Sequence, residues 1–174
     1  RTEFNIEGYP APEFMDLVLK VKPHQVTLVP DSPSQITSNS GWDTKVNLEF
    51  LTEVLDQFNS AGIRTSVFVA ADPEMVEYAA KAGADRVELY TEPYATNYPK
   101  DPETAIAPFI EATKTARKLG LGLNAGHDLS LVNLNYFYKN ISWLDEVSIG
   151  HALVSDALYM GLERTIQEYK NCLR

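Results

Sequence analysis

Hydrophobic and polar positions follow two periods along the chain, a short period typical of strands and a longer one typical of helices. Alternating or β-branched runs predict strands, and apolar residues three and four apart predict amphipathic helices. The predicted strands cover residues 2–9, 25–29, 64–70, 86–90, 122–125 and 146–149. The predicted helices cover residues 12–22, 47–60, 73–81, 102–119, 131–139 and 155–173. This pattern predicts a regular alternation of about six strand–helix units.

Proline and glycine mark the ends of these units. Pro12 and Pro73 stand where helices begin, a position that tolerates the missing N–H of proline. Gly62, Gly83 and Gly120 each follow a predicted helix and precede a strand, which forms a weak internal repeat. Glycine suits such a position because it closes a helix in the left-handed conformation at little steric cost. Repeated units of this kind imply parallel strands joined by right-handed crossovers.

The predicted fold class is therefore α/β, a (β/α)8 TIM barrel of which about six βα units are present, whereas a whole barrel has eight. Two polar stretches, residues 30–45 and 94–101, are predicted loops, and the first is long enough to suggest a functional role. No break in composition divides the chain, so residues 1–174 are predicted to form a single domain.

Composition narrows the classes of function. The net charge of -9, from 15 basic and 24 acidic residues, argues against a nucleic-acid partner. No apolar run reaches the roughly 18 residues of a membrane span. The single cysteine, Cys172, excludes an internal disulfide and favours a cytoplasmic protein. Neither a zinc-ligand spacing nor a nucleotide-binding glycine loop is found, so we expect no metal and no such cofactor.

Two glutamates stand on predicted barrel strands. Active sites of parallel βα folds lie at the carboxyl ends of the strands. Glu7 alternates with Asn5 on a strand expected to be buried, and Glu88 shares one side of its strand with Tyr90. A buried carboxylate is costly unless it has a partner or a chemical task. Each glutamate is therefore a candidate catalytic residue, and a salt bridge within the barrel is the structural alternative.

Two glycine–histidine pairs follow consecutive late strands. His127 comes after Gly126, where an imidazole could act as a general acid or base, or simply bind a loop carbonyl. Gly150 and His151 precede the last helix, where backbone N–H groups can bind an anion. Loops after the last two strands of such barrels often bind phosphate. By contrast, His24 precedes a strand and is expected on the opposite, stabilising face.

Five segments resemble the pyridoxine 5′-phosphate synthase family, in order and with matching spacing. They are Asn5-Ile6-Glu7, residues 28–30 with Gln35-Ile36-Thr37, Val87 to Thr91, Asn124 to Leu129, and Ile149 to Leu158. The resemblance implies a cytoplasmic (β/α)8 barrel that assembles as a homo-octamer without a metal or organic cofactor. It also implies a condensation of 3-amino-2-oxopropyl phosphate with 1-deoxy-D-xylulose 5-phosphate, which gives pyridoxine 5′-phosphate, phosphate and water.

The resemblance carries residue roles as well. Glu7 would accept a proton, His127 would donate one, and Glu88 would stabilise charged transition states. Thr37 would contact the deoxyxylulose phosphate, and three further residues, Asp128, Gly150 and His151, would hold the aminoketone phosphate. Since two acidic groups face one pocket, we expect a raised pKa for Glu7 or Glu88 through burial or mutual repulsion.

The chain departs from the family at two points. Asp128 stands where some relatives have glycine, and two βα units that precede the first strand in the family have no counterpart before Arg1. These units carry a second general base and phosphate-binding arginines, so we expect this chain alone to be inactive as the C-terminal part of a barrel. Two alternatives remain from the residues: a phosphosugar isomerase or epimerase that uses Glu7 and His127, and a non-catalytic phosphate-binding module.

Overall fold

The computed structural model describes residues 2–31 and 40–174. Its six strands form one parallel sheet in strictly sequential order, β1-β2-β3-β4-β5-β6. The strands are β1 (Asn5–Gly8), β2 (Gln25–Leu28), β3 (Arg64–Val69), β4 (Arg86–Tyr90), β5 (Gly122–Gly126) and β6 (Glu146–Ser148). The structure thus confirms about six βα units of a barrel wall.

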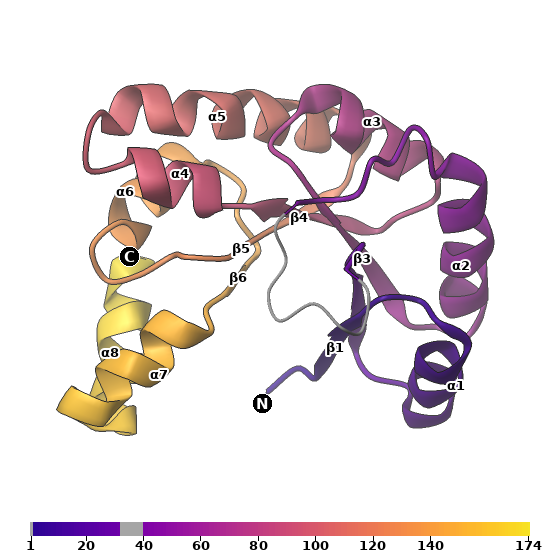
Figure 1. The fold of residues 1–174 in the computed structure, drawn as a ribbon, viewed down its shortest axis with the longest axis horizontal. Helices are drawn as coiled ribbons and strands as arrows, with labels where there is room; N and C mark the ends of the chain where they lie inside the picture. Colours follow the sequence, from indigo (N-terminus) through magenta and orange to yellow (C-terminus); the bar gives the residue numbers. More distant parts are fainter. Residues whose placement is uncertain (1, 32–39) are drawn as a thin grey trace.

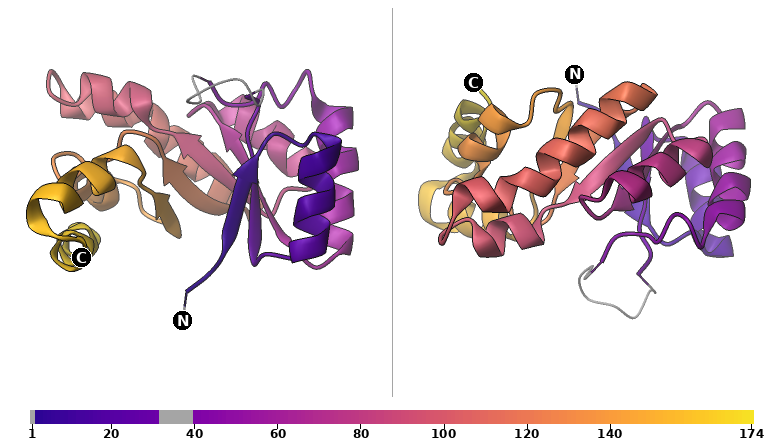
Figure 2. Two further views of the ribbon diagram at one scale, coloured as in Figure 1. Left: turned by 60° about the horizontal axis from the view of Figure 1, so that its bottom comes forward. Right: turned by 90° about the horizontal axis from the view of Figure 1, so that it is seen from above.

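Eight helices connect and follow these strands in the part of the chain that the structure describes. They are α1 (Pro12–Val21), α2 (Leu48–Ser60), α3 (Pro73–Lys81), α4 (Glu92–Asn97), α5 (Pro102–Leu119), α6 (Leu134–Asn140), α7 (His151–Met160) and α8 (Leu162–Cys172). Figure 1 shows the sheet curling inside an outer row of helices, with α1 and α2 at one end and α7 and α8 at the other. The two views of Figure 2 show the same helices on the convex side of the sheet.

Alternation along each strand separates the hydrophobic core from the barrel interior. Val67 and Val69 of β3, like Val87 and Leu89 of β4, are fully buried against the helices. The residues between them, Phe68 and Glu88, lie on the opposite face of their strands. Strand alternation therefore places the core between sheet and helices, and leaves Glu88 on the inner face.

Helices begin and end at the capping, proline and glycine residues of the sequence. The Asp72 carboxylate accepts a hydrogen bond from the Glu74 N–H at 2.8 Å, and Pro73 occupies the first turn of α3. Gly120 ends α5 with φ of +78°, in the left-handed region where a side chain would be strained. These local signals explain why the predicted bounds of α3 and α5 are confirmed.

Two predictions of local structure are wrong. Residues 94–101 were expected as a loop, but α4 occupies much of that stretch because Pro93 sits in its first turn and Tyr94 is buried in the core. A single C-terminal helix was expected over residues 155–173, but α7 and α8 are separate helices. Gly161 divides them with φ of +80° and ψ of 145°, a conformation outside the helical region.

Candidate active site

Charged groups toward the amino ends of the strands are paired with one another. The Arg86 guanidinium donates to the side-chain oxygen of Asn124 at 2.9 Å and lies 3.2 Å from the Glu146 carboxylate. One strand pair away, Arg64 donates to Gln25 at 2.9 Å and also binds Glu3. We call Arg64, Arg86 and these four partners the paired layer. Its hydrogen bonds link β3 with β2 and, as a separate group, β4 with β5 and β6.

Glu88 lies further toward the carboxyl ends and is differently placed. Its side chain is 1% exposed, and its Oε2 atom has no hydrogen-bond partner among the described residues. Burial raises its pKa to about 8, and the nearby Glu7 and Glu146 carboxyls add to the rise, while the Ser148 hydroxyl opposes it. Glu88 is therefore a proton-bearing group near neutral pH rather than half of a salt bridge.

Glu7 lies on β1, at one edge of the described sheet. The expectation of a buried strand is wrong for this residue, because β1 is an edge strand of the described sheet and Glu7 stays exposed. Even so, surrounding protein displaces part of the water near its carboxyl, and this desolvation and the Asp31 carboxyl raise its pKa. Glu7 in turn raises the pKa of Glu88, so the pKa values of both glutamates lie above their ordinary range, as expected.

His127 packs against two aromatic rings. Its imidazole centroid lies 4.9 Å from that of Phe68 and 5.4 Å from that of Tyr90. Desolvation lowers the pKa of His127, the nearby carboxyls of Asp128 and Asp31 oppose that change, and His151 reinforces it. A neutral, half-buried imidazole in this position can exchange protons near neutral pH.

The last strand leads directly into an exposed helix start. β6 ends at Ser148, Gly150 precedes α7, and His151 is the first residue of that helix. Gly150 and His151 are both exposed, and a Cβ added to Gly150 would meet nothing within 4 Å. The open backbone and the unpaired N–H groups of a first helical turn suit an anion such as phosphate.

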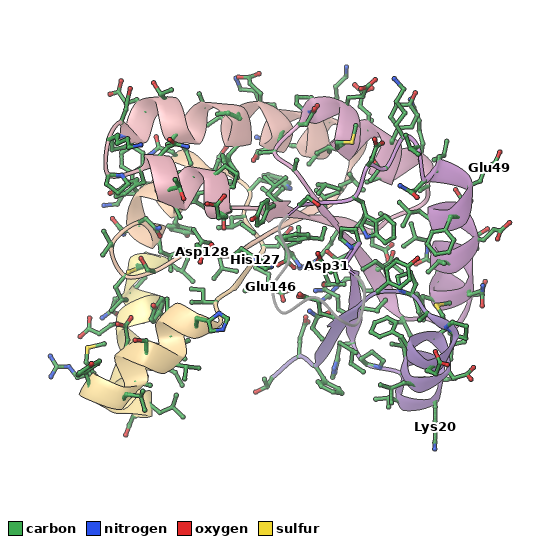
Figure 3. The ribbon with its side chains drawn as sticks, viewed as in Figure 1. Lys20, Asp31, Glu49, His127, Asp128 and Glu146 are labelled. Atoms are coloured by element: carbon green, nitrogen blue, oxygen red, sulfur yellow. The ribbon has the colours of Figure 1, made fainter. Side chains whose placement is uncertain are left out.

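The structure brings most of the predicted site residues to one place. Figure 3 shows His127, Asp128 and Asp31 on the concave side of the sheet, whereas Lys20 and Glu49 project from outer helices. Electrostatic effects connect Glu7 with Glu88, and His127 with Asp128 and His151. Thr37 lies outside the described residues. His24 lies at the amino end of β2, where its Nδ1 accepts the Phe4 N–H at 3.0 Å, as expected for a stabilising residue.

Sequence reasoning missed several members of this site. Phe68 and Tyr90 received no role in the prediction, but the rings of both contact His127. Asp31, beside Glu7 and His127, was passed over within a polar loop. The alternation of Arg86, Glu88 and Tyr90 was a usable signal, because three residues two apart on one strand share one face.

Within residues 2–31 and 40–174, no helix is both long and apolar enough to cross a bilayer. Nor do three or more His, Cys, Asp or Glu side chains gather there in a way that could hold a metal ion.

The sheet defines part of a (β/α) barrel, and titratable groups lie toward the carboxyl ends of its strands. A family comparison is more specific, since the family described as "Pyridoxal phosphate biosynthesis protein PdxJ" matches residues 1–174. The chain belongs to this family of vitamin B6 biosynthesis proteins.

Curated relatives agree over the whole chain. A pyridoxine 5′-phosphate synthase of Bacteroides thetaiotaomicron is 91% identical over 174 residues, which are 100% of this chain and 73% of that protein. The synthase of Phocaeicola vulgatus is 79% identical over 99% of this chain and 73% of its own length. That of Porphyromonas gingivalis is 54% identical over 99% of this chain and 72% of its own length.

Solved structures of distant sequence support the fold alone. Citrate synthase SbnG superposes with a TM-score of 0.60 at 13% identity, over 99% of this chain and 73% of that one. A xylose isomerase domain protein from Planctomyces limnophilus gives a TM-score of 0.59 at 10% identity, over 100% of this chain and 73% of its own.

Proposed function

We propose that the concave face of this chain supplies the proton-transfer groups of a pyridoxine 5′-phosphate synthase. The reaction would condense 3-amino-2-oxopropyl phosphate with 1-deoxy-D-xylulose 5-phosphate and release phosphate and water. One observation carries the assignment of the site: Glu7, Glu88 and His127 come from three different strands or strand ends, yet perturb one another or share Asp31 as a neighbour. Convergent titratable groups with shifted pKa values are typical of catalytic sites.

The chemistry requires several proton transfers on carbon and oxygen. Imine formation, loss of water and ring closure each need a base at one step and an acid at another. We assign proton acceptance to Glu7 and proton donation to His127. Glu88, protonated near neutral pH and holding an unpartnered oxygen, would donate a hydrogen bond to negative charge that develops on the substrate.

The aminoketone phosphate would bind where β5 and β6 end. Gly150 and the first turn of α7 offer backbone N–H groups, and His151 begins that helix. Asp128 has φ of +59°, in the left-handed region, which accounts for a position that glycine also suits. In this role Asp128 would contact phosphate through its backbone. Thr37, outside the described residues, keeps its proposed contact with the deoxyxylulose phosphate.

The proposal is tested by Glu7→Gln and His127→Asn, each made in the complete eight-unit barrel, in a two-substrate assay of product formation. Each change removes one proton-transfer group, so we expect kcat to fall by roughly 100- to 10,000-fold. His24→Asn is the matched control, because His24 is exposed at the opposite end of the strands and should leave kcat unchanged.

Other outcomes of the same assay would reject the proposal. Near-normal product formation by both variants would reject Glu7 and His127 as the proton-transfer groups. No product from the unmodified protein, with phosphate binding retained, would favour a non-catalytic phosphate-binding module. Proton exchange on the sugar phosphate at full rate without the amine substrate would favour an isomerase or epimerase.

We also propose that residues 1–174 act as one domain within a cytoplasmic homo-oligomer, an octamer by the family resemblance. The support is an exposed apolar surface on α7 and α8, where soluble monomers rarely gather such side chains. Its members are 39–89% exposed: Val154, Leu158, Tyr159, Leu162 and Ile166.

A further inference from the structure

The loop that carries His127 has an unusual backbone. His127 has φ of +80° and Asp128 has φ of +59°, both in the left-handed region that residues other than glycine rarely adopt. Two such residues in sequence need support from their surroundings to stay in place. The support must come from groups that hold the backbone on either side of the imidazole.

Thr91, which directly follows β4, provides that support. Its side chain is fully buried, and its hydroxyl lies 2.6 Å from the Gly126 carbonyl oxygen and also contacts the carbonyl oxygen of His127. The Thr91 N–H donates to the same Gly126 oxygen at 2.8 Å. One threonine thus binds the two peptide groups immediately before and after the imidazole-bearing Cα.

The position of Thr91 makes this arrangement distinctive. Thr91 is the N-cap residue of α4, where a threonine hydroxyl ordinarily accepts a hydrogen bond from the first turn. Here the hydroxyl makes no such bond, and contacts the β5 loop instead. The Thr91 hydroxyl therefore contacts the loop that holds His127 instead of capping α4.

Asn133 holds the far side of the same loop. Its side-chain amide donates to the Asp128 carbonyl at 3.1 Å and accepts the Ser130 N–H at 2.8 Å. Its own carbonyl accepts the hydroxyl of the fully buried Tyr94 at 2.8 Å, so Asn133 is itself anchored in the core.

We infer that Thr91 is a positioning residue for His127, holding the imidazole against Phe68 and Tyr90 in the orientation that proton donation requires. This inference rests on the role proposed for His127. The groups that face the imidazole are Tyr90 of β4, Asp31 after β2, His151 of α7 and Asp128 on its own loop. Release of the loop would let the ring move toward water.

The test is Thr91→Val, which keeps the shape of the side chain but removes the hydroxyl. Because a misplacement of about 1 Å can cost about 100-fold in rate, we expect kcat to fall by roughly 10- to 100-fold with KM nearly unchanged. Thr91→Ser, which keeps the hydroxyl, should restore most of the activity. Thr113→Val is the matched control, because Thr113 is also buried but its hydroxyl has no partner among the described residues.

A second readout does not depend on activity. The chain has three histidines, so NMR titration can follow the His127 imidazole once His24→Asn and His127→Asn assign the signals. In Thr91→Val we expect the His127 pKa to rise toward its ordinary value, as desolvation is relieved. Asn133→Ala removes the amide donor to Asp128 without adding a charge, and should shift the pKa in the same direction if Thr91→Val does not fold.

The outcomes separate the two ideas. Unchanged kcat and unchanged His127 pKa in folded Thr91→Val would overturn the positioning inference, even if His127→Asn is inactive. A shifted pKa in Thr91→Val together with full activity of His127→Asn would keep the positioning inference and reject the proposed proton donor.

Discussion

Two regions of the same inner face differ in whether their charged groups are paired with one another. In the paired layer, Arg86 contacts Asn124 and Glu146, and Arg64 contacts Gln25 and Glu3. At the carboxyl ends, Glu88 keeps an unpartnered oxygen and a raised pKa, and His127 has a lowered one. A partner of opposite charge stabilises the charged form of a side chain. Without such a partner, burial and neighbouring charges shift the pKa of the side chain. The two ends of the strands are therefore suited to stability and to chemistry, respectively.

The largest expected effect concerns the pH dependence of folding. The pKa of Glu88 is about 8 in the folded protein against an ordinary 4.5, so the folded state binds the proton more tightly. Stability from this group is complete below about pH 4.5 and is lost as pH rises toward 8, by up to about 1.4 kcal/mol per pH unit. In urea unfolding from pH 5 to 8, the free energy of unfolding of Glu88→Gln should rise relative to that of the unmodified protein as pH increases. A difference between the two proteins that stays constant over this range would contradict the raised pKa of Glu88.

Two glycines on β5 allow each region to be disturbed separately, because one lies beside Glu88 and the other beside Arg86. A Cβ on Gly126 would lie 2.2 Å from Glu88 Oε1, so Gly126→Ala must displace the carboxyl. We expect a loss of about 100-fold in kcat/KM from this misplacement. A Cβ on Gly122 would instead lie 2.7 Å from the Cγ atom of Arg86, in the paired layer. Gly122→Ala is therefore the matched control and should lower stability with little effect on kcat/KM. Equal kinetic losses in the two variants would show that the layers are not separate.

The smallest expected effect comes from breaking the paired layer. Arg86→Met leaves the buried Asn124 oxygen without its donor and Glu146 without its cation. We expect a loss of about 1–2 kcal/mol in the free energy of unfolding, since the ion pair is partly exposed and contributes little by itself. Chemical denaturation measures this loss. A kinetic loss as large as that of Gly126→Ala, at unchanged stability, would assign Arg86 to the chemistry instead.

Much of the fold could be predicted because its signals are local. Pro73 and Gly120 mark helix ends by backbone restrictions that no distant contact alters, and alternation along β4 selects Glu88 for the inner face. The helix over residues 92–97 was missed because it depends on tertiary packing, namely the burial of Tyr94. The break at Gly161 was missed although its signal, a glycine with φ of +80°, is local. Elements with strong local preferences are therefore predictable, and elements stabilised by packing are less so.

The candidate site was predicted as residues rather than as an arrangement. Glu7, Glu88 and His127 stand out through residue type and position, since each interrupts or follows a predicted strand. Their neighbours Phe68, Asp31 and Thr91 do not, because their roles depend on which strands lie side by side. Register is a long-range property, and a single sequence shows only the periodicity that permits it.

The sequential order of the sheet has a consequence for how the protein is made. Within the described residues each strand pairs with its neighbours in the chain, so successive units can add to the sheet as they leave the ribosome. The proposed site, however, combines Glu7 from β1 with His151 at the start of α7. A nascent chain should therefore acquire most of its sheet before it can bind substrate, so that structure precedes activity during synthesis.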